Sequence, residues 1–104
     1  MIFVYTILKM LNLIVSSAIL AKLRDKHQVS LREIEQCFEN LDGDFLEDDL
    51  EEHQTDPATL WFVAPTNRGR LLKVIFMSKQ GKVTIKSAYE PNIRVIEIYK
   101  KFGY

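Results

Sequence analysis

The sequence of 104 residues contains a single cysteine, Cys37. One cysteine excludes a disulfide bond within the chain, and it does not supply the paired thiolates that structural zinc sites usually need. Chains without disulfide bonds are typical of reducing compartments. We therefore expect a cytoplasmic protein that uses neither a metal ion nor another cofactor.

Basic residues are also missing from a long stretch of the chain. Residues 33–67 contain eleven Asp or Glu and no Lys or Arg, whereas residues 68–104 contain nine basic residues and two acidic ones. Residues 1–32 carry five basic residues and Asp25 as their one acid. The formal net charge of zero therefore hides an acidic middle and a basic C-terminal third. Such asymmetry indicates surfaces that bind different partners, a polyanion among them.

Signals for membrane insertion or secretion are weak. Residues 1–21 carry Lys9 as their one charge, but Lys9 would lie deep in an apolar helix. The extreme N-terminus has no positive region, and the small residues that follow make a poor cleavage site. We expect no membrane association. Because Met10 begins a plausible chain of its own, residues 1–9 form a candidate N-terminal extension, which could add a strand or contact a second copy in a homodimer.

A chain of this length forms one domain, which we assign to residues 1–104. Ser30 and Glu33 have the spacing of a capping box and begin a helix with an apolar stripe. Glycines at 69 and 81 predict tight connections within an antiparallel meander. The predicted order is a strand at 12–15, a helix from Ser16 or Ser17 to about Lys26, a helix from Ser30 to about Asn40, strands at 60–64, 71–77 and 82–88, and a helix that Asn92 caps.

The last predicted strand has two different faces, because alternate residues of a strand point to opposite sides of a sheet. This alternation predicts one apolar face and one face that carries two lysines. The apolar face holds Val83, Ile85 and Ser87, and the other face holds Lys82, Thr84 and Lys86.

Seven residues around the first two predicted helices follow the pattern K-x(3)-KH-x-VS-x(2)-E-x(4)-F. Through them the chain resembles the BrnT-like toxins of bacterial type II toxin–antitoxin systems, and the resemblance extends over about residues 11–102. It implies an α+β, RelE-like fold with a small antiparallel sheet, two N-terminal helices packed on one face and a C-terminal helix. The matching residues are Lys22, Lys26, His27, Val29, Ser30, Glu33 and Phe38.

The resemblance also implies a function. Members of this family are taken to be messenger-cleaving ribonucleases that a cognate antitoxin neutralises, so the expected partners are RNA and an antitoxin of the ribbon-helix-helix type. Metal-free RNA cleavage needs a proton acceptor, a proton donor and fixed positive charge. The candidate catalytic residues are His27, Lys86, Tyr89 and Arg94, and the candidate RNA-binding residues are Lys26, Lys82, Tyr99 and Lys100.

Each of these residues also has a structural interpretation. His27 could cap the carbonyl groups at a helix end, the lysines could belong to a solvated face, and the two tyrosines could pack the last helix on the sheet. Cys37 and Trp61 suit the core, although Trp61 could also stack on a base. The acidic run at 47–52 suits a solvated loop, and His53 lacks the spacing of a metal ligand.

The chain departs from the family pattern at three positions. Tyr89 stands where the family has Arg, and Val95 and Ile96 stand where it has Glu-Arg. A catalytically silent interaction domain on the same fold is therefore the alternative function. The stretch 87–92 (SAYEPN) is also similar to small bacterial proteins labelled ADP-ribosyl-(dinitrogen reductase) hydrolase, but a chain of this size cannot build the paired magnesium site which that chemistry uses.

Overall fold

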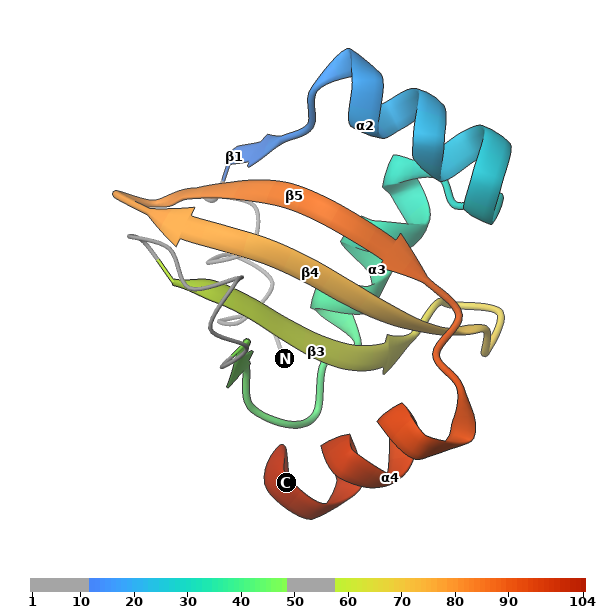
Figure 1. Ribbon diagram of the computed structural model, residues 1–104, viewed down its shortest axis with the longest axis vertical. Coiled ribbons are helices and arrows are strands. Elements are labelled where there is room, and N and C mark those ends of the chain that lie inside the picture. Colours follow the sequence, from blue (N-terminus) through green and yellow to red (C-terminus); the bar gives the residue numbers. More distant parts are fainter. Residues whose placement is uncertain (1–11, 49–57) are drawn as a thin grey trace.

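The computed structural model describes residues 12–48 and 58–104. The candidate N-terminal extension, most of the acidic run and His53 lie outside the described residues. Within the described part the chain is α+β, with three α-helices, a π-helical turn and a five-stranded sheet (Figure 1). The α+β fold class that we predicted is therefore confirmed.

The sheet is mixed, and its strand order is β1-β5-β4-β3-β2. The predicted antiparallel meander is confirmed in β3, β4 and β5. The first strand pairs parallel to β5, and a short strand that we did not predict pairs with β3 at the far edge. The strands are β1 (Asn12–Ile14), β2 (Leu46–Glu47), β3 (Thr59–Pro65), β4 (Leu71–Lys79) and β5 (Lys82–Tyr89).

The helices begin where the sequence predicts them. Ser16 caps the first helix, Ser30 and Glu33 form the capping box of the second, and Asn92 caps the last by accepting from the Val95 amide. The first helix differs from our prediction, because its α-helical part is short and continues as a π-helical turn. The segments are α2 (Ser17–Lys22), the π-helical turn η1 (Leu23–His27), α3 (Leu31–Glu39) and α4 (Ile93–Phe102).

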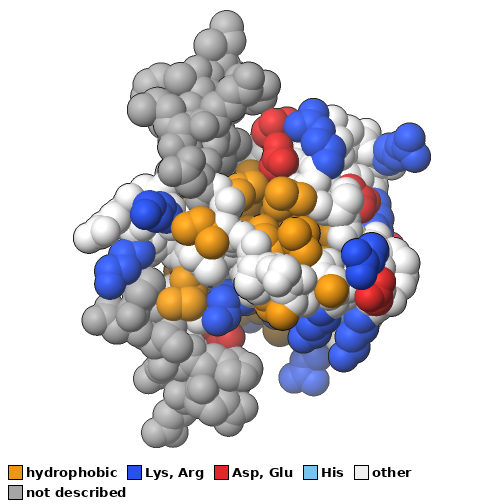
Figure 2. All heavy atoms as spheres, turned by 90° about the horizontal axis from the view of Figure 1, so that it is seen from above, with side chains coloured by type: hydrophobic (Ala, Val, Ile, Leu, Met, Phe, Trp, Pro, Cys, Tyr) orange, Lys and Arg blue, Asp and Glu red, His pale blue; other side chains and the backbone are white. Residues whose placement is uncertain are grey.

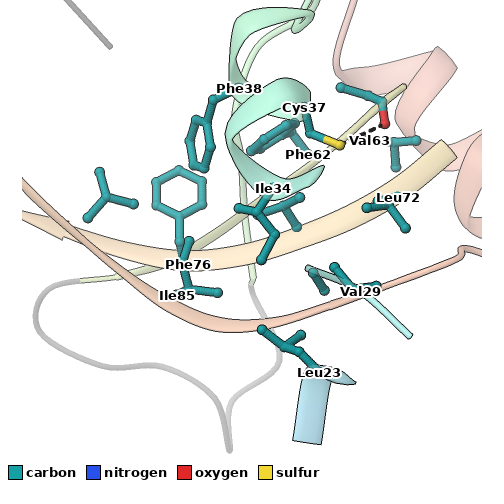
Figure 3. Close-up of a cluster of buried hydrophobic side chains, with 14 of the residues drawn as sticks. Leu23, Val29, Ile34, Cys37, Phe38, Phe62, Val63, Leu72, Phe76 and Ile85 are labelled. Carbon is teal, nitrogen blue, oxygen red and sulfur yellow. Dashed lines mark hydrogen bonds between the residues drawn. The ribbon is translucent and has the colours of Figure 1, made fainter. Parts of the chain in front are cut away.

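The core lies between one face of the sheet and the layer formed by η1 and α3 (Figure 3). Phe38 on α3 packs edge-on against Phe62 of β3 and Phe76 of β4, with ring centroids 4.8 and 5.3 Å apart. Cys37 is fully buried and donates from Sγ to the carbonyl oxygen of Ala64 at 3.4 Å. The prediction that Cys37 is a core residue is therefore confirmed.

A β-bulge changes the second half of β5. Ile75 pairs with Ser87 while Phe76 pairs with Ile85, so Lys86 is the extra residue. Our prediction that Ser87 shares the apolar face with Ile85 is wrong, because the bulge turns the strand by one position and Ala88 takes the buried place instead. Without the bulge, Tyr89 would point into the same apolar layer; with it, Tyr89 lies on the opposite face.

The C-terminal helix α4 lies beside β3 and is held there through Tyr99 (Figure 1). Tyr99 is 1 % exposed, and its hydroxyl donates to the carbonyl oxygen of Asp44 at 2.8 Å. The Asp44 amide in turn donates to the carbonyl oxygen of Gly103 at 2.7 Å. These two bonds join the end of α4 to the loop that follows α3, and they leave Tyr99 as a packing residue.

Candidate active site at the C-terminal end of strand β5

His27 and Tyr89 meet at the end of β5. Strand β1 pairs with β5 only as far as Thr84, so η1 can lie beside the remaining half of that strand. There the imidazole of His27 and the ring of Tyr89 approach to 5.5 Å between centroids, with their planes tilted by 36°. Both side chains are half-buried. Two of the four predicted catalytic residues are thus brought together from segments about sixty residues apart in the sequence.

A lysine that we did not predict lies next to this pair. Lys73 on β4 is directly opposite Tyr89 in the antiparallel register. Its ammonium group lies 5.9 Å from the centroid of the Tyr89 ring and 4.5 Å from the centroid of the Trp61 ring. Two aromatic faces therefore attract one cation and hold it at the same end of the sheet. Lys73 supplies a fixed positive charge close to Tyr89.

The backbone of His27 is held by a second residue that we missed, Arg70. Its guanidinium donates to the carbonyl oxygens of His27 at 3.0 Å and Gln28 at 2.8 Å. It also donates to the carboxylates of Glu33 at 3.0 Å and Glu90 at 3.1 Å. One side chain therefore connects the end of η1, the start of α3 and the residue after β5.

The electrostatic environment of His27 favours its neutral form. Partial burial lowers the pKa of the imidazole, and the positive charges of Lys26 and Lys22 lower it further. A histidine whose pKa lies below its ordinary value of 6.5 is mostly unprotonated at pH 7. His27 can therefore accept a proton at neutral pH, which is the property of a general base.

The other predicted site residues are divided between exposed positions and the core. Lys86 on the bulge and Arg94 in the first turn of α4 are exposed, and among the described residues neither has a ring contact or hydrogen bond with His27 or Tyr89. Lys82 begins β5 whereas Tyr89 ends it, which separates them by about 23 Å. Of the predicted RNA-binding residues, Lys26 is exposed next to His27, Lys100 is exposed on α4, and Tyr99 is in the core.

The residues that sequence reasoning missed gave weak local signals. Lys73 lies on the face of β4 that alternates with the buried residues Leu72 and Val74, so its face was predictable. Its contact with Tyr89 was not, because that contact depends on the bulge in β5. Arg70 follows the turn glycine Gly69 and had no distinguishing pattern, since all four of its acceptors come from other parts of the chain.

The surface around the N-terminal helix has a different character. Figure 2 looks onto the side that carries α2 and β1, where hydrophobic side chains gather in the middle and Lys and Arg side chains lie around them. Ile14 on β1 and Leu20 on α2 are 42 % and 40 % exposed. Exposed apolar groups with a basic border are typical of surfaces that contact partners.

Metal and membrane chemistry find no support in the described residues. Between 12 and 48 and between 58 and 104, no three His, Cys, Asp or Glu side chains are grouped as metal ligands would be. In the same ranges no helix has both the length and the apolar character that crossing a membrane requires.

The candidate site consists of His27, Tyr89 and Lys73, and Arg70 binds the backbone of His27. Comparisons with protein-family models, with curated proteins and with solved structures found no match for this chain.

Proposed function

We propose that this protein is a metal-independent ribonuclease, and that it acts as the toxin component of a type II toxin–antitoxin system. The observation that carries the proposal is the contact of a neutral histidine with Tyr89 beside the fixed ammonium group of Lys73. These groups are of the three kinds that RNA cleavage without a metal ion needs. The BrnT-like pattern around His27 supports the same function.

The reaction follows from the chemistry of the three side chains. His27 accepts the proton of a ribose 2′-hydroxyl, and the oxygen attacks the adjacent phosphorus. The bond between O2′ and phosphorus forms while the bond between phosphorus and O5′ breaks, and the Tyr89 hydroxyl protonates the leaving O5′. Lys73 stabilises the extra negative charge on the phosphorane. The products are a 2′,3′-cyclic phosphate and a 5′-hydroxyl end.

The proposal includes the compartment and the partner. RNA is the substrate, the cytoplasm is where the protein acts, and a ribbon-helix-helix antitoxin neutralises it. Lys26, exposed beside His27, binds a neighbouring phosphate, because phosphate contacts supply most of the affinity for RNA.

The direct test uses purified protein and a single-stranded RNA in the presence of EDTA. We expect cleavage that yields 2′,3′-cyclic phosphate ends and that stops when the nucleotide at the cut site is 2′-deoxy. His27→Gln should lower the rate at least about 100-fold, because it removes the proton acceptor. Lys79→Gln is the matched control, since Lys79 is exposed at the far end of β4 from Lys73. It should cleave like the wild type.

Expression in a bacterial host without the partner provides the second test. The wild type should arrest growth, and Tyr89→Phe should relieve the arrest, because the substitution removes the proton donor and keeps the ring. Lys86→Ala measures whether the residue at the β-bulge contributes to the growth arrest. Harmless expression of the wild type at high level, together with no cleavage in vitro, would rule out the ribonuclease.

A second candidate function is an interaction domain without catalysis. The observation that favours it is that Lys86 and Arg94, two of the predicted catalytic residues, have no ring contact or hydrogen bond with His27 or Tyr89 among the described residues. This function predicts that the wild type neither cleaves RNA nor arrests growth. It also predicts that His27→Gln still binds any partner that the wild type binds.

A further inference from the structure

The chain ends its first helical segment in an unusual way. The π-helical turn η1 finishes at His27, and Gln28 then adopts the left-handed conformation with φ of 51°. A non-glycine residue at positive φ carries a small energetic cost, which surrounding contacts must offset. The last carbonyl groups of a helix also lack an N–H donor within the helix. The end of η1 therefore needs support from elsewhere in the chain.

Arg70 gives that support. Its two terminal nitrogens donate to the carbonyl oxygens of His27 and Gln28 at 3.0 and 2.8 Å. The planar guanidinium can donate in several fixed directions at once, whereas a lysine ammonium is a compact point charge. The Arg70 side chain is only 25 % exposed, so water competes less for these bonds than it does at the surface.

Two carboxylates fix the guanidinium in turn. Glu33, 27 % exposed, accepts from Nη1 at 3.0 Å and also belongs to the capping box of α3. Glu90 accepts from Nε at 3.1 Å and follows Tyr89 directly. Arg70 therefore joins the residue next to Tyr89 to the backbone of His27. Arg70 is therefore linked to His27 through the backbone carbonyl of His27, and to Tyr89 through the next residue, Glu90.

We propose that Arg70 is a positioning residue, which sets the contact between His27 and Tyr89 by binding the backbone of one and the neighbour of the other. An effect of Arg70 on catalysis rests on the proposed ribonuclease function. The contact between the His27 and Tyr89 rings, which Arg70 sets, can be measured without any activity. Arg70 touches no substrate in this account; it acts through His27.

The test uses protein in which His53→Gln leaves His27 as the one histidine, because the chain has two. NMR then follows the ring contact of His27 with Tyr89 and the titration of the imidazole. The variants are Arg70→Met, which removes charge and donors, and Arg70→Lys, which keeps the charge. Arg24→Met is the matched control, since Arg24 lies in the same turn, is 73 % exposed and pairs with Asp25. The titratable and charged groups that face His27 come from several elements. They are Lys22 of α2, Lys26 of η1, Tyr89 with its neighbour Lys73, and Arg70 with its carboxylate partners Glu33 and Glu90.

We expect both Arg70 variants to lose the His27–Tyr89 ring contact and to titrate His27 at higher pH, since the freed turn exposes the imidazole to water. Arg24→Met should keep the ring contact. In the RNA assay, Arg70→Lys should lower kcat roughly 10-fold to 100-fold with little change in KM, because a misplaced general base loses rate rather than binding.

Several results would overturn the proposal. If Arg70→Lys keeps both the ring contact and the wild-type titration of His27, the positive charge at position 70 is enough, and Arg70 does not position His27 through its guanidinium hydrogen bonds. If the Arg70 variants do not fold, Glu90→Ala decides: Glu90 is 65 % exposed, so that variant should fold and weaken the ring contact. An unchanged contact there would refute the proposal. A wild type without ribonuclease activity would end the proposed function and leave the NMR test of Arg70 intact.

Discussion

Gly43→Ala tests how α4 is held against the rest of the protein. A methyl group at position 43 would lie 2.7 Å from the carbonyl oxygen of Gly103 and 2.7 Å from the Tyr99 hydroxyl oxygen, well inside the ordinary contact distance of 3.4 Å. Both atoms take part in the bonds that join Asp44 to α4. They can therefore move only by weakening those bonds.

The magnitude follows from two opposing effects. Overpacking of this kind costs about 1–3 kcal/mol. Gly43 is not at positive φ, so alanine also reduces the entropy of the unfolded chain, which stabilises the protein by about 0.4–1 kcal/mol. The net loss is about 1–2 kcal/mol, which corresponds to a fall in Tm of roughly 4–16 °C for a domain of this size.

Denaturant unfolding followed by circular dichroism measures this loss, and a double-mutant cycle identifies its cause. Tyr99→Phe removes one of the two close oxygens, so Gly43→Ala should cost less in that background, by about 0.5–1 kcal/mol. Asp42→Ala, an exposed neighbour, should change stability by less than about 0.5 kcal/mol. A Gly43→Ala protein as stable as the Asp42→Ala control, or equal costs in the two backgrounds, would refute the reasoning.

Three further predictions concern the core, the capping box and the last helix. Burial raises the pKa of Cys37 to about 12, so a thiol reagent at pH 8 should label the folded protein at least about 1000-fold more slowly than the denatured protein; rapid labelling of folded protein would contradict the buried position. Burial opposes the ionisation of Glu33, but hydrogen bonds from the Ser30 backbone and from Arg70 outweigh it and hold the pKa below 4.5. An acid whose pKa is lower in the folded than in the unfolded state stabilises the protein above its unfolded-state pKa, and this stability is lost as the pH falls through its folded-state pKa. Glu33→Gln should therefore lower the free energy of unfolding at pH 7 and make it decline less steeply below pH 4.5. Urea titrations at several pH values measure both effects. Asn92→Ala should cost about 1 kcal/mol, since Asn92 accepts from the Val95 amide at 2.9 Å; equal stability in thermal unfolding would mean that the cap is not needed.

Local rules account for most of the fold that the sequence predicted. Ser16, Ser30 and Asn92 cap the helices because a side-chain oxygen reaches an amide three residues ahead, which depends on neighbours alone. The turn at Gln80 and Gly81 has two residues at positive φ and joins strands whose alternating residues were already visible. The parallel pairing of β1 with β5 was beyond such rules, because it brings together segments about seventy residues apart.

The candidate site divides in the same way. The sequence by itself determined that His27, Tyr89 and a basic C-terminal third are present, since residue type and local pattern fix those properties. The tertiary structure alone decided that His27 meets Tyr89, because the bulge at Lys86 turns Tyr89 away from the core and towards Lys73. It also decided the role of Arg70, whose four acceptors lie on segments that come together only in the folded chain. Hydrogen bonds between segments that are far apart in the sequence depend on the packing of the whole domain, and no local pattern in the sequence specifies them.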